Sequence, residues 1–558
     1  MKMNLERSFF AEIKVKMRNA KTVFFVAVAF ATLLAVTGCG QKRGQQPSLE
    51  GVTQSITFSG YPMDAKGQTI SWFGTTGYLP PNAQFASASD SPFHIYLQEM
   101  LGVNIAWQFP LTGADGNQAL NLALASRDIP MVIFSTGLMT QSQLLIEEGT
   151  IYDLTPYLEK WSPAYWKLLQ SNPEYDKAMK TDSGKYYGYG FFREDGGWNE
   201  TYLGPVINKT WLDELGLPMP KTISDWDRTL RAFKERYGAT LSFDWGLGTY
   251  GGIGGAFGAH AFGSFYGLYI DENRKVQIAN IQPEYKNHLE QLITWWQDGL
   301  IDPDILSILT ATQARSNALN KKMGISITTM GQLSNWIQDA RANNNGAEWI
   351  GLQYPTGDDG TLVSIPGGSG IGVSVAVITT STPPEQLELV MRALDYSYTD
   401  EGFLYWNFGK QGNSWDFDSQ GNPALLPLVA DDPNGVSAVM DKYAGSVWSG
   451  NTVQATAMIH MKNTPEAVAA NDLWFWPNEA ITAHDKIPSG LTFTSEEAIR
   501  SAELATTIST FVGESTSLFI TGSSSLDTWD DYVARVKSLG AEELLSIYQA
   551  AYDRYLAR

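Results

Sequence analysis

Strand-like and helix-like hydrophobic patterns alternate through the first third of the chain. Residues 68–73 (QTISWF) and 103–109 (VNIAWQF) carry the β-branched and aromatic residues of strands, and 131–134 (MVIF) is typical of a short buried strand. Residues 91–101 begin with Ser-Pro, a cap and first-turn pair, and repeat apolar residues at helical spacing. This order predicts a parallel sheet covered by helices on both faces.

The same alternation returns later in the chain. Amphipathic helices are predicted over 224–237, with Ser224 as its N-cap, and over 284–299. Residues 367–378 (GGSGIGVSVAVI) predict a strand that returns to the first sheet, and 383–397 its helix. Such an out-and-back path predicts two lobes built from discontinuous segments, with crossings at 181–190 and 398–402.

Length and composition support a well-packed protein of several lobes. At 558 residues the chain is too long for one compact core. Its apolar fraction of 43%, with 18 Trp, 25 Tyr and 25 Phe, argues against disorder. The formal net charge of −20 repels phosphate backbones, so nucleic acid is excluded as a partner and a neutral sugar is favoured over a polyanionic one.

The N-terminus has the pattern of a secretory signal. A basic segment, 17–21, precedes the apolar run 23–36, which is short for a membrane span, and the lead before Met17 suggests that translation begins there. Residues 34–39 (LAVTGC) resemble the bacterial lipoprotein signal, in which the cysteine is acylated. Cys39 is the one cysteine of the chain, so no disulfide forms within it. A plain membrane-anchoring helix is the weaker alternative.

Several segments, in order, resemble family 1 extracellular solute-binding proteins, the lipoproteins that serve carbohydrate ABC importers. They are 122–133 (LALASRDIPMVI), 151–158 (IYDLTPYL), 184–190 (GKYYGYG), 206–218 (VINKTWLDELGLP), 221–227 (KTISDWD), 518–522 (LFITG) and 529–533 (WDDYV). The last two resemble the C-terminal helices of the long, LipO-like subgroup. Two positions depart from the family, Met131 and Gln411, where acidic residues are common.

The resemblance implies an α/β, periplasmic-binding-protein-like clamshell with two discontinuous lobes and a hinge. The expected divisions are a signal peptide (1–38), a tether (39–53), lobe 1 (54–180 and 361–398), lobe 2 (181–360 and 399–510) and C-terminal helices (511–558). It also implies an extracytoplasmic monomer, held to the bacterial membrane through palmitate or another acyl chain on Cys39, and permease subunits of an importer as partners.

Aromatic side chains beside loops are the candidate sugar contacts. The apolar face of a pyranose stacks on aromatic rings, while its hydroxyls bond to carboxylates, amides and guanidinium groups. Trp72 is first among them, because it stands near the end of the first predicted strand. The ligand-binding candidates are Trp72, Arg193, Trp198, Asn199, Glu200, Trp245, Tyr250, Gln332, Trp336, Trp406, Trp415, Trp474 and Trp476. For each ring the alternative is core packing, and for each charge a solvated loop.

Catalytic and metal motifs are missing from the sequence. The paired carboxylates at 358–359, 431–432 and 530–531 read as solvated turns or a helix face, and the five histidines lack metal-ligand spacing. Residues 416–421 (DFDSQG) read as an ordinary turn, since Pro427 stands where a calcium loop needs glutamate. Neither enzymatic activity nor a cofactor is expected.

We therefore predict a lipid-anchored protein that closes two lobes around an oligosaccharide and presents it to an importer. A secreted glycoside-active enzyme and a peptide-binding relative are the alternatives.

Overall fold

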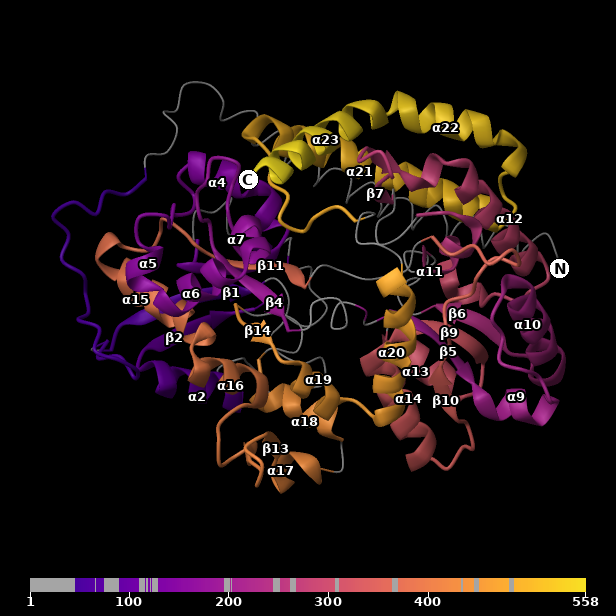
Figure 1. Ribbon diagram of the computed structural model, residues 1–558, viewed down its shortest axis with the longest axis horizontal. Coiled ribbons are helices and arrows are strands. Elements are labelled where there is room, and N and C mark those ends of the chain that lie inside the picture. The colour runs from indigo at the N-terminus through magenta and orange to yellow at the C-terminus, as the bar shows by residue number, and fades with distance from the viewer. Residues whose placement is uncertain are drawn as a thin grey trace, which may run out of the picture.

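Two separate sheets organise the computed structural model of the chain (Figure 1). The structure describes residues 46–558 except 66, 75–89, 110–115, 117–118, 121, 123–128, 195–200, 202, 244–250, 261–266, 307–310, 364–369, 433–434, 446–450 and 481–485. Each sheet has its own hydrophobic core, and the two cores define lobe 1 and lobe 2. The predicted two-lobed α/β architecture is confirmed.

Lobe 1 contains a six-stranded sheet in the order β14-β4-β11-β3-β1-β2. The strands are β1 (Thr69–Gly74), β2 (Asn104–Gln108), β3 (Val132–Thr136), β4 (Tyr189–Arg193), β11 (Ile371–Ile378) and β14 (Val453–Gln454). The accompanying helices are α2 (Pro92–Leu101), α4 (Leu138–Glu147), α5 (Leu158–Trp161), α6 (Pro163–Ser171), α7 (Pro173–Ala178), η6 (Pro384–Gln386), α15 (Leu387–Asp395), η7 (Tyr396–Tyr398) and α16 (Asp400–Phe408). As predicted, the strand at 371–378 returns to this sheet after the chain has built lobe 2.

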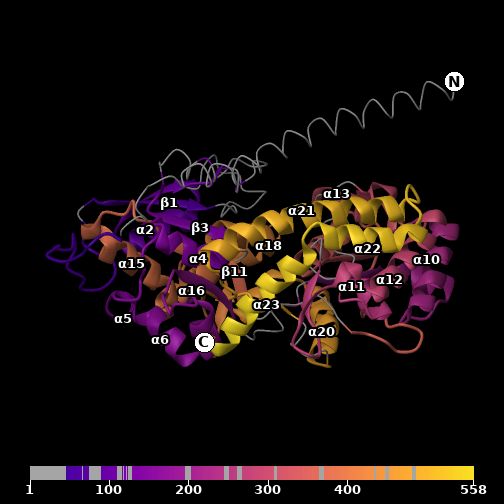
Figure 2. The same ribbon diagram turned by 90° about the horizontal axis from the view of Figure 1, so that it is seen from above.

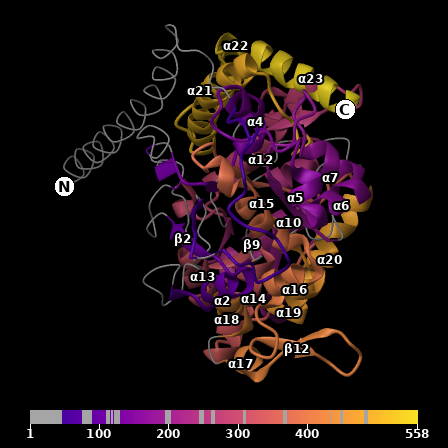
Figure 3. The same ribbon diagram turned by 90° about the vertical axis from the view of Figure 1, so that its left-hand side faces the viewer.

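A small helical extension continues lobe 1 beyond α16. It comprises the hairpin β12 (Trp415–Phe417) and β13 (Pro423–Leu425) with α17 (Pro427–Ala430), α18 (Val436–Tyr443) and α19 (Thr456–Lys462), and the hairpin projects from the body in Figure 3. We expected residues 399–510 in lobe 2, but β14 pairs with β4 and Trp406 lies in the lobe 1 core. The contacts therefore place 399–462 with lobe 1.

Lobe 2 contains a four-stranded sheet in the order β10-β5-β9-β6. The strands are β5 (Leu203–Asn208), β6 (Thr240–Phe243), β9 (Met323–Thr329) and β10 (Trp349–Gly351), and a separate hairpin pairs β7 (Leu268–Ile270) with β8 (Val276–Ile278). The helices are α9 (Lys209–Leu215), α10 (Ile223–Tyr237), α11 (Gly251–Gly254), η3 (Gly255–Phe257), η4 (Ala279–Ile281), α12 (Pro283–Gln297), η5 (Pro303–Leu306), α13 (Ala311–Leu319), α14 (Met330–Ala342) and α20 (Pro465–Ala480).

The start of α10 shows how local chemistry sets an element boundary. The side chain of Thr222 accepts a hydrogen bond from the Asp225 backbone, and the Asp225 carboxylate accepts one from the Thr222 backbone. This reciprocal capping box makes Thr222 the N-cap, two residues before Ser224, the predicted cap. Ser224 instead lies in the first turn.

The C-terminal helices cross both lobes. They are α21 (Ser495–Ile520), η9 (Leu526–Thr528), α22 (Trp529–Ser538) and α23 (Ala541–Ala557). α21 packs on α4 of lobe 1 and on α12 of lobe 2, and α23 packs antiparallel against α21 on its way back to lobe 1 (Figure 2). We call α21 and α23 together the C-terminal strap.

Candidate ligand-binding site

The strand directions of lobe 1 bring five strand ends to one edge of its sheet. β1, β2 and β3 are parallel, and β11 is antiparallel to both β3 and β4. β4 and β14 therefore run with β1 to β3, since β14 pairs with β4 in parallel. The carboxyl ends of these strands and the amino end of β11 share this edge. Ligands of open α/β sheets bind beyond such an edge.

Lobe 2 presents an equivalent edge. β6 is parallel to β9, while β5 is antiparallel to β9 and to β10. β6, β9 and β10 therefore end where β5 begins. In each lobe, all strands of the sheet but one therefore have their carboxyl ends at the same edge. We call it the carboxyl edge of that lobe.

Both strand-to-strand connections between the lobes join these two edges. One runs from the end of β4 to the start of β5 through 194–202, and the other from the end of β10 to the start of β11 through 352–370. Because a residue spans at most about 3.6 Å, the first connection keeps the edges within roughly 35 Å of each other. The topology thus directs the two edges toward a shared space, which is our candidate ligand-binding site. The first crossing begins after Arg193, later than the predicted 181–190, because β4 belongs to lobe 1.

A third connection is only two residues long. Asn463 and Thr464 join α19 to α20, and the Asn463 side chain donates to the Ile459 carbonyl in α19 at 2.8 Å. The Ser334 hydroxyl of α14 donates to Asn463 Oδ1 at 3.0 Å and accepts from the Thr464 amide at 3.0 Å. One serine of lobe 2 therefore fixes both residues of the connection.

Trp72 lies within β1, close to the lobe 1 edge. It is directly opposite Trp107 of β2, with ring centroids 5.3 Å apart, and its own ring is only 2% exposed. Trp107, near the end of β2, and Phe109, which directly follows β2, are half-buried and stacked with centroids 5.9 Å apart. Trp107 lies level with Trp72 but is more exposed, and Phe109 lies further toward the edge. Sequence reasoning missed Trp107 and Phe109, although 103–109 was predicted as a strand whose end, like that of 68–73, carries aromatic residues.

Four other predicted indoles lie in hydrophobic clusters. Trp336 meets Trp349 edge to face at 5.3 Å, and Trp406 meets Phe93 at 5.0 Å. Each of these two predicted rings is 1% exposed. Since a sugar needs an open ring face for stacking, Trp336 and Trp406 offer none in this conformation. The core alternative describes their observed positions.

Trp415 and Trp474 are buried in the same way, and their indole N–H groups bond within the protein. Trp415 donates to the Gly409 carbonyl at 2.8 Å. Trp474 donates to the carbonyls of Pro205 and Leu352 at 3.1 and 3.2 Å, and its ring covers Gly204, where a Cβ atom would approach it to 2.3 Å. Both indoles therefore serve packing in the structure.

Arg193 and Gln332 do lie at the two edges. Arg193 ends β4, and its guanidinium stands 5.2 Å from the centre of the Phe191 ring. Gln332 is in the first turn of α14, directly after β9, and its backbone amide is capped by Thr329 Oγ1 at 3.2 Å. They approach the shared space from opposite lobes, so both remain candidate ligand contacts.

The other predicted residues lie outside the described part of the chain. Trp198, Asn199, Glu200, Trp245, Tyr250 and Cys39 are among the residues excepted above, and the side chain of Trp476 is likewise not described.

Two histidines are buried as neutral rings. Burial lowers the pKa of His94 to about 3 and that of His288 to about 4. His288 stacks on Phe257 with ring centroids 5.5 Å apart. Burial also raises the pKa of Asp395 to about 6, against the hydrogen bonds that its carboxylate accepts from the amides of Tyr165 and Ala164. All of these groups lie inside the lobes and serve the fold.

The paired aspartates tested for catalysis are held as surface groups. Hydrogen bonds from Ser224 and Thr222 lower the pKa of Asp358, and the Thr361 side chain and amide lower that of Asp359. Asp530 and Asp531 are exposed in the first turn of α22. Within the described ranges, three or more His, Cys, Asp or Glu side chains nowhere gather to hold a metal ion. None of the helices in the described part is sufficiently long and apolar to span a bilayer.

Comparison with known proteins finds relatives along nearly the whole chain, although no family model matches it. It is 24% identical to the fructooligosaccharide ABC transporter substrate-binding protein FusA of Streptococcus pneumoniae, over 94% of this chain and 97% of FusA. It is also 24% identical to lipoprotein LipO of Bacillus subtilis, over 61% of this chain and 68% of LipO.

Solved structures agree with this relationship. The alginate-binding protein AlgQ2 superposes with a TM-score of 0.75 at 20% identity, over 87% of this chain and 98% of AlgQ2. FusA in complex with kestose superposes with a TM-score of 0.70 at 21% identity, over 88% of this chain and all of FusA. The chain is thus a homologue of the substrate-binding proteins of ABC transporters and has their two-lobed fold.

Proposed function

We propose that this protein captures an oligosaccharide between the carboxyl edges of its two lobes and delivers it to an ABC importer. The observation that carries the proposal is that both strand connections between the lobes join the carboxyl edges of the two sheets. A ligand that touches both edges stabilises the closed arrangement, because it makes contacts there that the open arrangement lacks. FusA, a relative over 94% of the chain, is named for fructooligosaccharide and has been solved with kestose.

The contacts we assign to the sugar come from both lobes. Trp107 and Phe109 supply aromatic surface from lobe 1, Arg193 supplies donors, and Gln332 supplies an amide from lobe 2. Trp72 supports Trp107 from the neighbouring strand β1. The predicted residues in 195–200 and 244–250 stay candidates, since both segments follow strands that end at these edges.

The remaining proposals concern the cell surface. The signal pattern before Cys39 supports export and acylation, and the polar segment 40–53 supports a tether. We propose permease subunits as partners and a monomer as the working form. Replacing Cys39 by Ser should move the protein from the membrane fraction to the soluble fraction.

Tryptophan fluorescence titration with a panel of oligosaccharides tests the central proposal. We expect saturable, reversible quenching by one class of sugar, which is recovered intact on release. Trp107→Phe should weaken binding roughly tenfold by shrinking the stacking surface, whereas Trp166→Phe, on α6 of lobe 1, should bind as the parent does. Cleaved sugar would establish a glycoside-active enzyme instead, and a response to peptides alone would establish a peptide-binding protein.

A further inference from the structure

A cavity of about 620 Å³ opens on lobe 2, where α10 begins. Four segments line it: the first turns of α10, the 3₁₀ helix η3, the second half of α12 and the turn 357–359. Its volume lies in the range of small-ligand pockets. None of the residues predicted to bind ligand belongs to it.

Backbone hydrogen bonds join three of the four walls, and the fourth, α12, is held to η3 by the stacking of Phe257 on His288. The Ile223 amide donates to the Thr356 carbonyl at 3.0 Å, which joins the turn to α10. The Val363 amide donates to the Gly255 carbonyl at 3.1 Å, which joins the same segment to η3. The turn itself is closed by the Gly357 amide, which donates to the Thr361 carbonyl at 2.8 Å. The cavity is therefore preformed, so binding there costs little ordering of the chain.

The floor of the cavity is apolar and its rim is polar. Ile223 and Ala256 are buried at the floor, and Phe257 is half-buried with its ring fixed by stacking on His288. Ser224, Thr294, Asp358 and Asp359 are exposed at the rim. A sugar ring has the matching arrangement, with an apolar face and hydroxyls around its edge.

The polar side chains of the cavity differ in how many hydrogen bonds and ion pairs they already form within the protein. Asp227 is held by Arg231, at 2.8 and 3.0 Å, and by the indole N–H of Trp295 at 3.0 Å. Asp359 accepts from the Thr361 amide at 2.9 Å and forms no ion pair among the described residues. The half-buried Gln291 amide has no hydrogen-bond partner in the described part of the chain. A ligand would thus meet an amide that both donates and accepts, and a carboxylate that accepts.

We propose that this cavity is an additional carbohydrate site, which takes a neutral sugar unit. The ring lies against Phe257, and its hydroxyls bond to Gln291 and Asp359. A purely cationic ligand would leave the donors of Gln291 unused, and the two rim aspartates repel an anionic sugar. The proposal rests on the proposed function, because it assumes that the protein meets oligosaccharides. The turn 357–359 also belongs to the connection 352–370, so an occupant contacts a segment that joins the lobes.

Hydrogen–deuterium exchange of the whole protein, with and without kestose, tests this assignment. We expect kestose to protect peptides covering 355–363 and 286–297. The double variant Gln291→Ala/Asp359→Asn should lose this protection and need at least tenfold more sugar to regain it. The matched control is Gln297→Ala/Glu290→Gln, two exposed positions on α12 outside the cavity, and it should behave as the parent does. Thermal unfolding would confirm that both variants are folded.

The outcomes separate the two proposals. Fluorescence quenching by kestose without protection at 355–363 overturns the additional site and leaves the proposed function standing. Equal protection in the double variant overturns the site as well, because the effect would then arise elsewhere. Protection by digalacturonate equal to that by kestose overturns the neutral-sugar assignment. If no sugar in the panel changes either fluorescence or exchange, both proposals fall.

Discussion

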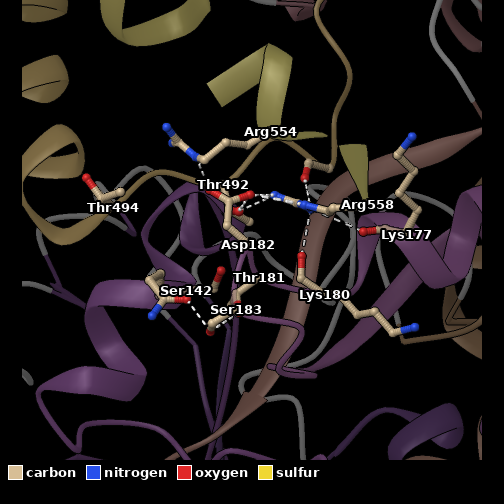
Figure 4. A network of polar contacts seen from close by, with 12 residues as sticks. Ser142, Lys177, Lys180, Thr181, Asp182, Ser183, Thr492, Thr494, Arg554 and Arg558 are labelled. Carbon is tan, nitrogen blue, oxygen red and sulfur yellow. Dashed lines mark hydrogen bonds and ion pairs between the residues drawn. The ribbon is translucent and has the colours of Figure 1, made fainter. Parts of the chain in front are cut away.

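The two ends of the C-terminal strap are attached to the lobes by different chemistry. On lobe 2 the attachment is apolar: Leu504, Ile508 and Val512 of α21 and Leu544 of α23 are buried in the lobe 2 core. On lobe 1 much of the attachment is ionic and centres on Asp182, which pairs with Arg554 and Arg558 at 2.5 Å each (Figure 4).

Arg558 uses nearly all of its donors in this attachment to lobe 1, which we call the ionic anchor. Arg558 Nη1 donates to the carbonyls of Lys180 and Gly490 at 2.7 and 3.0 Å, while its other nitrogens bond Asp182 and Thr492. Directional bonds of this kind break over short displacements, whereas apolar packing depends mainly on buried area. The ionic anchor is therefore the part of the strap's attachment that salt can weaken.

Truncating the apolar end should have the largest effect. Ile508→Ala empties a fully buried position, and we expect a loss of about 3 kcal/mol in the free energy of unfolding. Denaturant titration at low and high salt measures it. The loss should be the same at both salt concentrations; a strong salt dependence would mean that the lobe 2 attachment is not mainly apolar.

Breaking the ionic anchor should lower the free energy of unfolding by less than Ile508→Ala does, and the loss should depend on salt. Arg558→Ala removes a side chain that is 8% exposed and should lower the free energy of unfolding by about 2 kcal/mol, with a smaller loss at high salt. Arg558→Lys should recover little, since an ammonium lacks the planar fork. A full recovery by lysine would show that charge alone, rather than the fork geometry, makes the anchor.

A surface ion pair on the same strap provides the matched comparison. Arg500 of α21 pairs with Glu543 of α23 at 2.7 Å, and both side chains are nearly half exposed. Arg500→Ala should change the free energy of unfolding by less than about 1 kcal/mol. A loss as large as that of Arg558→Ala would contradict the distinction between the anchor and an ordinary surface pair.

The pH dependence of the free energy of unfolding should include a contribution from His288 of lobe 2, which is separate from the strap. His288 has a pKa of about 4 in the folded protein, below the ordinary value of 6.5, because burial disfavours its charged form. The unfolded chain therefore binds more protons between these values, and stability falls as the pH decreases from about 6.5 toward 4. His288→Phe keeps an aromatic ring beside Phe257 and should flatten this part of the profile. If the stability of the variant fell as steeply as that of the parent over this pH range, the burial of His288 as a neutral ring would be contradicted.

Local patterns in the sequence predicted individual elements well but could not place the lobe crossings. The strands at 69–74, 104–108 and 132–136 follow directly from β-branched and aromatic runs. The crossing expected at 181–190 lies after Arg193, because β4 pairs with β11 and β14 in the lobe 1 sheet, where Gly188 and Gly190 allow close packing. Pairing between β4 and β14, some 260 residues apart, is not visible in any local pattern.

In the candidate site, too, local sequence patterns predicted some features and missed others. A strand pattern predicts that an indole lies near a sheet edge, but it does not determine which neighbour covers the ring. Trp474 is buried because Gly204 leaves space beneath it, and Trp336 because Trp349 meets its edge. Gly204 is distant from Trp474 in sequence, and Trp349 lies on a different element from Trp336, so neither contact is visible in a local pattern. Arg193 and Gln332 lie at the edges because they directly end or follow strands, and their contact with a ligand stays a prediction.

The most direct test of sugar capture between the lobes is small-angle X-ray scattering of the protein titrated with the oligosaccharide that quenches its fluorescence. We predict that the radius of gyration decreases saturably, with the same midpoint as the quenching, and that the sugar is recovered intact. An unchanged radius of gyration at saturating sugar would contradict capture by lobe closure.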